Sequence, residues 1–169
     1  MSVIEILTYP HSFLKESAKP VDNIDSKIQL LIDNMATTMY QAPGVGLAAI
    51  QVGIDKSLLV YDIADKDDGH DLHVLINPQI IAREGQIISE NEGCLSVPDF
   101  RADVKRSARI LVEAVDRQGK PLRLEAEGLL AIVLQHEIDH LNGKLFIDHV
   151  SALKRQMYAR RIQKQLKKN

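Results

Sequence analysis

The sequence predicts an α+β domain in which antiparallel β-sheets pack around a central buried helix. Three observations support this class. Apolar residues recur at helical spacing early in the chain, several later segments alternate between apolar and polar residues, and a strongly apolar helical segment follows them. This order of helix, strands and then helices is typical of α+β proteins. We expect a single domain, residues 1–169, in which an N-terminal helix and a basic C-terminal helix (151–169) flank the core.

The first long helix is predicted over residues 25–40. Asp25 is a suitable N-cap, because its carboxylate can accept hydrogen bonds from the first free backbone N–H groups, and Pro43-Gly44 stops the helix. Its apolar residues are spaced three or four positions apart: Ile28, Leu31, Ile32, Met35 and Met39.

Strands are predicted where apolar runs or clean alternation lie between turn residues. Asn77-Pro78 is expected to end one of them, and the turn 116–119 joins the last two as a hairpin. The predicted strands are 58–63, 72–76, 79–89, 109–115 and 122–126.

A second long helix is predicted over residues 128–141, ended by Asn142-Gly143. The segment before its first histidine is apolar on nearly every side, so this helix should be buried. Ser151 is then expected to cap the last helix.

The composition is that of an ordinary globular protein, with 45% hydrophobic and 26% charged residues. No segment is long and apolar enough to span a membrane, and the first residues do not resemble a signal peptide. We therefore expect a cytoplasmic protein with no membrane contact. The single cysteine, Cys94, excludes an internal disulfide, and it is core filler, a reactive thiol or a metal ligand.

Charge is unevenly distributed along the chain. The net charge is −2, yet residues 154–169 contain seven basic residues and no acidic one. A basic tail on an acidic body suggests an anionic partner for the tail. A solvated terminal helix that keeps the protein soluble explains the same residues equally well.

Residues 136–140 read His-Glu-Ile-Asp-His and indicate a metal site. On a helix His136 and His140 point within about 40° of each other, so both imidazoles can hold one cation. Glu137 falls to one side, within reach of a water on the metal, and Asp139 falls to the other, where it can support a ligand. The pattern also occurs by chance on surface helices, but on a buried helix these polar groups are costly without a partner.

Cys94 offers a third ligand from the segment 92–98, Glu-Gly-Cys-Leu-Ser-Val-Pro. A thiolate suits a metal of borderline softness, and Gly93 lets the backbone approach a substrate closely. Three protein ligands leave a fourth position open, which is the arrangement of catalytic rather than structural sites.

Zinc peptidases with a His-Glu-x-x-His motif take their third ligand downstream instead. This chain has no glutamate after Glu137, and Phe146 stands where one class of these enzymes needs a histidine. Asp148 and His149 remain, at unfamiliar spacing, which makes Cys94 the better candidate.

Residues 44–51 read Gly-Val-Gly-Leu-Ala-Ala-Ile-Gln. Small residues permit close backbone approach, and the Gln51 amide can donate a hydrogen bond to a developing oxyanion. Taken alone, the segment is better explained as a tight turn between helix and strand.

Together the segments 44–51, 92–96 and 135–140 make the chain similar to peptide deformylases, in that family's order and at about its spacing. The resemblance extends from Thr8-Tyr9-Pro10 to the final helix. It implies a hydrolase that removes the formyl group from the N-terminal N-formyl-methionine of newly made polypeptides and releases formate. It also implies one divalent metal ion, Fe²⁺ in the native enzyme, which Zn²⁺, Ni²⁺ or Co²⁺ can replace.

The resemblance also implies roles for individual residues. Glu137 would be the general base and acid. Gln51 and the Leu95 backbone N–H would hold the oxyanion, and Gly46 would hydrogen-bond the substrate backbone. The metal ligands would be Cys94, His136 and His140.

Helix geometry bears on substrate specificity. Leu129, Ile132 and Val133 lie within about 60° of the metal-facing direction, so they present an apolar strip that suits a methionine side chain. Val45 is expected to add to this pocket. The three helix residues are as well explained by ordinary core packing.

Arg101 is expected to contact the peptide downstream of the methionine. Equally, Arg101 or Arg106 could pair with Glu92 and steady the Cys94 loop, and the sequence does not separate these arrangements.

The expected partners are N-formyl-methionyl nascent peptides and, through the basic C-terminal helix, the ribosome near its exit tunnel, because similar deformylases dock there with such a helix. A monomer is expected. Two other classes stay open: a metallopeptidase that cuts internal peptide bonds, and a ribosome-associated protein without activity, although a binding module needs no such set of Cys, His, Glu and Gln residues.

Overall fold

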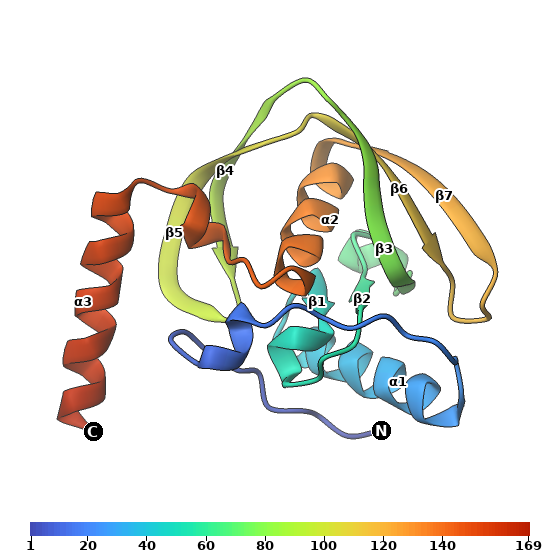
Figure 1. Ribbon diagram of the computed structural model, residues 1–169, viewed down its shortest axis with the longest axis horizontal. Coiled ribbons are helices and arrows are strands. Elements are labelled where there is room, and N and C mark those ends of the chain that lie inside the picture. The colour runs from blue at the N-terminus through green and yellow to red at the C-terminus, as the bar shows by residue number, and fades with distance from the viewer.

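A computed structural model describes residues 1–169 of the chain. Helix α2 (Gly128–Leu141) lies at the centre, between a five-stranded sheet and a two-stranded sheet (Figure 1). Helix α1 (Ser26–Gln41) lies below it, and helix α3 (Ala152–Lys168) lies at the edge of the molecule beside the smaller sheet. The structure confirms the predicted α+β class and the position of the central helix.

The larger sheet is antiparallel throughout, in the order β1-β2-β3-β6-β7. The smaller sheet pairs β4 (Ile87–Cys94) with β5 (Val97–Arg106), also antiparallel. The strands of the larger sheet are β1 (Gly46–Ala48), β2 (Leu58–Tyr61), β3 (His73–Glu84), β6 (Arg109–Val115) and β7 (Pro121–Glu127).

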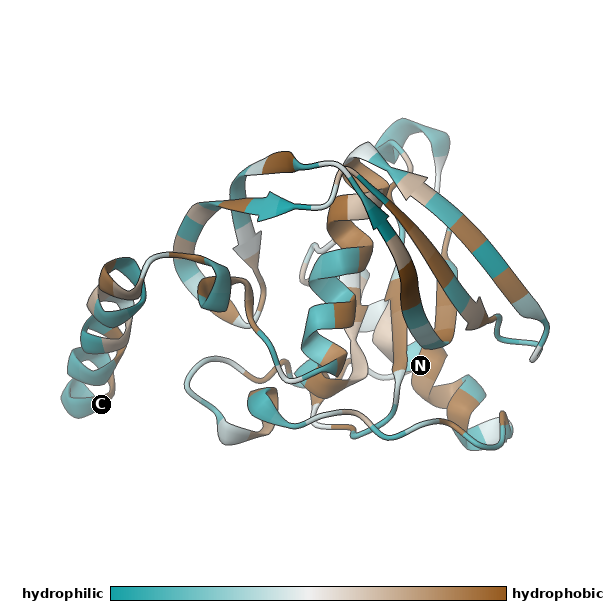
Figure 2. Cartoon of the chain, turned by 45° about the horizontal axis from the view of Figure 1, so that its top comes forward, coloured by the Kyte–Doolittle hydropathy of each residue, from teal (hydrophilic) through white to brown (hydrophobic).

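Strand β2 is buried on both faces, which explains its uninterrupted apolar sequence. Leu59 and Tyr61 belong to the core on the α2 side, whereas Leu58 and Val60 belong to the core on the α1 side. Strand β7 alternates between apolar and polar residues, as its bands at the right of Figure 2 show, because one of its faces turns to solvent. The sheet thus separates two cores and presents one face of β1 to α2.

Two predictions about strands were wrong. Strand β3 does not end at Asn77-Pro78 but continues to Glu84, because Asn77 takes a φ of 52° and a register shift between Ile76 and Gln79 absorbs the irregular residues. The predicted strand 79–89 is two strands, since Gly85, with a φ of 68°, turns the chain from β3 into β4.

Helix α2 has its predicted range, and α1 begins and ends one residue later than predicted. The Asp25 carboxylate accepts hydrogen bonds from the N–H groups of Lys27 and Ile28, both at 3.0 Å. The prediction that α2 is buried was wrong at its first turn, where Leu129 is 57% exposed because it lines an open cleft. Ser151 caps α3 as predicted, accepting a hydrogen bond from the N–H of Lys154 at 3.3 Å.

Among the helices of the structure, none combines the length and apolar character needed to cross a membrane.

Candidate metal centre and substrate cleft

The three predicted metal ligands meet beside the start of β5. Cys94 ends β4, and His136 and His140 stand one turn apart on the buried face of α2. Cys94 Sγ and His136 Nε2 each lie 3.3 Å from His140 Nε2, and the ligand atoms of all three residues lie within 4.8 Å of one another.

This arrangement fits a single divalent cation. Around a tetrahedral metal with bonds of about 2.0 Å to nitrogen and 2.3 Å to sulfur, ligand atoms stand roughly 3.3–3.7 Å apart. Burial is the main cause that lowers the pKa of His140 well below its ordinary value, and the positive charge of nearby His136 adds to it. The His140 imidazole is therefore neutral and keeps a lone pair for a metal. The thiol and imidazole donors are those that zinc, iron, nickel and cobalt accept.

A chain of buried charges holds His136 in place. His136 Nδ1 lies 2.7 Å from Glu92 Oε1, and because a carboxylate only accepts hydrogen bonds, Nδ1 carries the proton and Nε2 is left free toward Cys94. Arg106 donates from Nε to Glu92 at 3.3 Å and from Nη1 to Asp139 at 2.7 Å. The partner of Glu92 is therefore Arg106.

Glu92 remains ionised in this network. Burial raises its pKa, but the hydrogen bonds from His136 and Arg106 outweigh burial and lower the pKa to about 2.

The two downstream residues considered as alternative ligands, His149 and Asp148, have other partners. His149 Nε2 donates a hydrogen bond to Asp139 at 2.8 Å, so His149 is not among the ligands. Asp148, the other downstream candidate, accepts a hydrogen bond from the Leu145 N–H at 2.8 Å.

Glu137 stands beside the ligand cluster without belonging to it. Its side chain is buried, and Oε2 has no hydrogen-bond partner in the protein. Burial raises its pKa to about 7. A carboxylate with this pKa and a free oxygen is able to take up and return a proton near neutral pH.

The Gln51 amide has a fixed orientation. Its Oε1 accepts a hydrogen bond from the Ala48 N–H at 2.9 Å, so Nε2 must face the other way, where it donates to Ser96 Oγ at 3.1 Å and lies 3.7 Å from Cys94 Sγ. The segment 44–51 is thus more than a tight turn: it forms β1 and a 3-10 helix, Ala49–Val52, that carries Gln51.

Ser96 is a site residue that the sequence analysis missed. It is fully buried, and its N–H donates to Cys94 Sγ at 3.4 Å while its hydroxyl accepts from Gln51. Its position two residues after Cys94, within the same motif, was the available signal.

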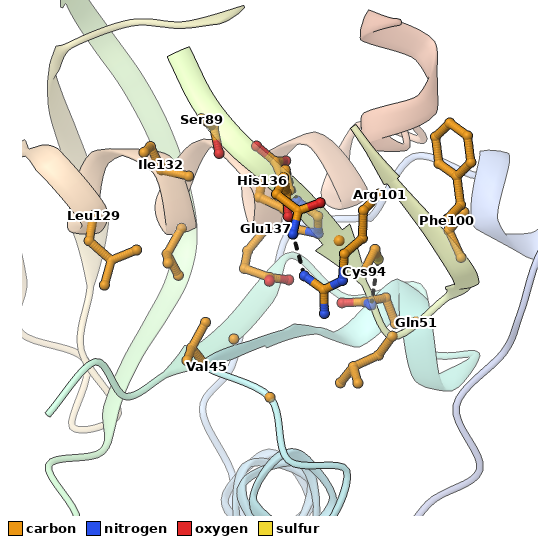
Figure 3. Close-up of a pocket in the computed structure, with 18 of the residues that line it drawn as sticks. Val45, Gln51, Ser89, Cys94, Phe100, Arg101, Leu129, Ile132, His136 and Glu137 are labelled. Atoms are coloured by element: carbon orange, nitrogen blue, oxygen red, sulfur yellow. Dashed lines mark hydrogen bonds and ion pairs between the residues drawn. The ribbon is translucent and has the colours of Figure 1, made fainter. Parts of the chain in front are cut away.

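A cleft of about 790 Å³ opens in front of these residues. Glu137, Cys94 and Gln51 point toward a common space, and the Arg101 side chain reaches over it (Figure 3). His140 lies beneath the floor of the cleft, 1% exposed. All other predicted site residues line it: Val45, Gly46, Gln51, Cys94, Leu95, Arg101, Leu129, Ile132, Val133, His136 and Glu137.

The apolar strip on α2 faces this cleft. Leu129 and Val45 are 57% and 50% exposed, unlike core residues, whereas Val133 is buried and still contributes to the lining.

Arg101 lies across Gly93, where an added Cβ would stand 3.0 Å from Arg101 Nη1, and Arg101 donates a hydrogen bond to the Asn91 carbonyl at 3.2 Å. The lining also includes Asp99 and Phe100, which the sequence analysis did not single out.

Comparisons with known proteins agree on one family. The model of the polypeptide deformylase family matches residues 3–156. A peptide deformylase of Desulfosudis oleivorans is 56% identical over 99% of this chain and 96% of its own length. The crystal structure of a Legionella pneumophila peptide deformylase superposes with a TM-score of 0.90 at 46% identity, covering 98% of this chain and 96% of that one. A peptide deformylase from Ehrlichia chaffeensis in complex with actinonin has a TM-score of 0.91 at 37% identity, covering 98% of each chain.

Proposed function

The chain belongs to the peptide deformylase family, and from this premise we propose which role each residue of its cleft has in deformylation. As a peptide deformylase, the protein hydrolyses the N-terminal formamide of newly synthesised polypeptides and releases formate. One observation carries the proposed roles: three metal-ligand atoms converge beside a buried carboxylate that has an unpaired oxygen.

Cys94, His136 and His140 would hold one divalent cation. When bound there, the cation supplies Lewis acidity toward the formyl oxygen and lowers the pKa of water. We propose Fe²⁺ as the native metal. Zn²⁺, Ni²⁺ or Co²⁺ should be able to replace it, because mixed thiolate and imidazole ligands accept all four. Metal analysis after anaerobic purification tests this assignment, and zinc alone in material from the native host would contradict it.

Glu137 moves the proton. It takes a proton from the attacking water as the new C–O bond forms at the formyl carbon. It then gives that proton to the nitrogen that leaves when the C–N bond breaks. The products are formate and the free amino group of methionine, and Glu137 ends in its starting state. The raised pKa and the unpaired oxygen of this carboxylate suit both transfers.

Gln51 and Leu95 stabilise the negative charge on the formyl oxygen. Gln51 donates from Nε2, whose direction is set by the Ala48 N–H, and Leu95 donates from its backbone N–H. A donor of this kind is typically worth about 3 kcal/mol in the transition state. Ser96 hydrogen-bonds both the Gln51 amide and the Cys94 sulfur, which fixes the oxyanion site relative to the metal site.

The rest of the cleft binds the peptide. Gly46 would hydrogen-bond the substrate backbone, and Arg101 would contact the residues after methionine. The methionine side chain would pack on Val45, Leu129, Ile132 and Val133, whose exposed apolar surface at the cleft supports this assignment.

The decisive assay measures formate release from formyl-Met-Ala-Ser by the metal-loaded protein. The matched control is the unformylated peptide Met-Ala-Ser. We expect formate from the first and no cleavage of the second, because the cleft offers its catalytic groups to a terminal formamide. Cleavage of the unformylated peptide would identify a metallopeptidase instead.

We further propose that the enzyme acts as a cytoplasmic monomer, one catalytic domain over residues 1–169, that docks on the ribosome near the exit tunnel through α3. Support comes from the surface of α3, where every basic side chain except the half-buried Arg155 is exposed and only Tyr158 and Ile162 are buried. Replacing Lys164, Lys167 and Lys168 with Gln should weaken cosedimentation with ribosomes and reduce its salt dependence, because fewer phosphates are neutralised. Equal cosedimentation of both proteins would show that α3 is a solvated helix.

A further inference from the structure

One wall of the cleft is a bulge in β5. Glu92 pairs with Ala102 and Cys94 pairs with Val97, so the four residues 98–101 stand opposite Gly93 alone. Asp99 takes a positive φ of 58° within this bulge. Asp99, Phe100 and Arg101 line the cleft, which makes the conformation of the bulge part of the binding site.

Helix α3 holds this bulge from outside the cleft. The Tyr158 hydroxyl donates to the Pro98 carbonyl at 3.0 Å, and the Arg161 guanidinium donates to the next carbonyl, that of Asp99. Arg161 also lies over the Tyr158 ring, 5.1 Å from its centroid. Tyr158 is 2% exposed although it belongs to the helix at the edge of the molecule (Figure 1).

Aromatic packing continues from α3 to the metal centre. The Phe100 ring lies 5.0 Å from the Tyr158 ring and 5.7 Å from the Phe146 ring. Phe146 in turn stacks 6.1 Å from His136. Figure 3 shows Phe100 on the far side of Cys94 from Leu129, so the bulge borders a different part of the cleft from the apolar strip on α2.

From these contacts we infer that Tyr158 is a positioning residue for substrate binding: it fixes the bulge 98–101, and through Phe100 and Arg101 it sets the affinity of the enzyme for peptide residues that follow the methionine. Tyr158 touches no reacting group, and its effect reaches the peptide only through the bulge. The inference rests on the proposed function, in that it takes this cleft to be where the formylated peptide binds.

The test compares two substrates, formyl-Met-Ala and formyl-Met-Ala-Ser-Ala, on the metal-loaded enzyme. Tyr158→Phe removes the hydroxyl and keeps the ring, so packing and folding are retained. Arg161→Gln removes the second hydrogen bond to the bulge. Arg160→Gln, one residue earlier and exposed, is its charge-matched control.

We expect Tyr158→Phe to raise KM for the tetrapeptide about fivefold, the scale of one lost hydrogen bond, with kcat unchanged and KM for the dipeptide unchanged. Arg161→Gln should act in the same direction, and Arg160→Gln should leave both substrates unaffected. Metal content and melting temperature are measured for each variant.

Two results would overturn the inference. One is a tetrapeptide-to-dipeptide KM ratio in Tyr158→Phe equal to that of the wild type. The other is a parallel loss on both substrates that follows the melting temperature, which is the result of a merely structural role. If the wild type releases formate from neither peptide, the proposed function fails, and that outcome is distinct from both.

Discussion

The Glu137 carboxyl group rests against the Cα of Gly46. A methyl group on Gly46 would stand 2.6 Å from Glu137 Oε1 and 2.9 Å from both Cδ and Cγ. Because the crowded atoms include Cγ and the carboxyl carbon Cδ, Glu137 could not accommodate the methyl group by moving its oxygens alone. Gly46 therefore leaves the space that the Glu137 carboxyl group occupies, in addition to its proposed contact with the substrate.

Gly46→Ala separates these two roles, since alanine retains the backbone N–H. We expect kcat to fall about a hundredfold, because a displacement of about 1 Å in a catalytic group has effects of that size, with metal content unchanged. Gly44→Ala is the control: its methyl group would crowd Leu95 Cδ1, at 2.8 Å, at the flexible end of a side chain, and its other neighbours would lie at 3.5 Å or more. Wild-type kcat in Gly46→Ala would mean that Glu137 does not depend on this space.

Glu137→Gln tests the proton transfer directly. Glutamine has the same shape but cannot take up the proton, so kcat should fall by about 10²–10⁴ while the metal stays bound. Metal analysis of the same sample is the necessary control, since Glu137 adjoins the ligand His136. Unchanged turnover with metal in place would remove Glu137 from the mechanism.

Glu92→Gln should weaken metal binding. The substitution removes the negative charge of the group that accepts the hydrogen bond from His136 Nδ1, and it leaves Asp139 as the remaining carboxylate paired with the buried Arg106. We expect the metal dissociation constant to rise about 10–100-fold, as is usual when a group that orients a ligand is lost. Glu90→Gln, an exposed position on the same strand, should bind metal like the wild type. Competition with a chelator measures both constants.

Arg101→Ala should raise KM for formyl-Met tripeptides several-fold, with kcat and metal content unchanged. The guanidinium is held over Gly93 by the Asn91 carbonyl, and its side chain lines the cleft. Steady-state kinetics on formyl-Met-Ala-Ser measure the effect. An unchanged KM would restrict Arg101 to holding the β4–β5 sheet.

Asp62 should make stability depend on pH. Burial raises its pKa, but hydrogen bonds from the Tyr40 hydroxyl at 2.6 Å and from the N–H groups of Ala64 and Asp71 outweigh burial, and the pKa is lowered below its ordinary value of 3.8. A carboxyl group with a lowered folded pKa stabilises the protein above its unfolded pKa. That stabilisation is lost as the pH falls below 3.8 toward the folded value.

The corresponding measurement is the melting temperature of the wild type and of Asp62→Asn at a series of pH values. The wild type should be the more stable protein at neutral pH, and the difference should shrink below pH 4. A difference that stays constant over the whole range would show that Asp62 does not titrate in this way.

The elements governed by local rules could be predicted from the sequence. Helix α2 has the predicted bounds, and Asp25 caps α1, because helical spacing and capping depend on residues a few positions apart. The ligand types and the pairing of His136 with His140 follow from the same local geometry. The strand was wrongly predicted to end at Asn77-Pro78, because a bulge inside a sheet is stabilised by residues distant in the sequence. Here the Asn77 side chain hydrogen-bonds to the backbone of Val21.

Tertiary structure alone decided the rest of the site. Three features depend on which surfaces of β1, β4 and α2 face each other. They are the pairing of Glu92 with Arg106 and not Arg101, the orientation of the Gln51 amide, and the exposure of Leu129. Along the chain, the end of each of these segments lies more than 30 residues before the start of the next. Their contact follows from burial of the shared core, and no spacing within a single segment determines it.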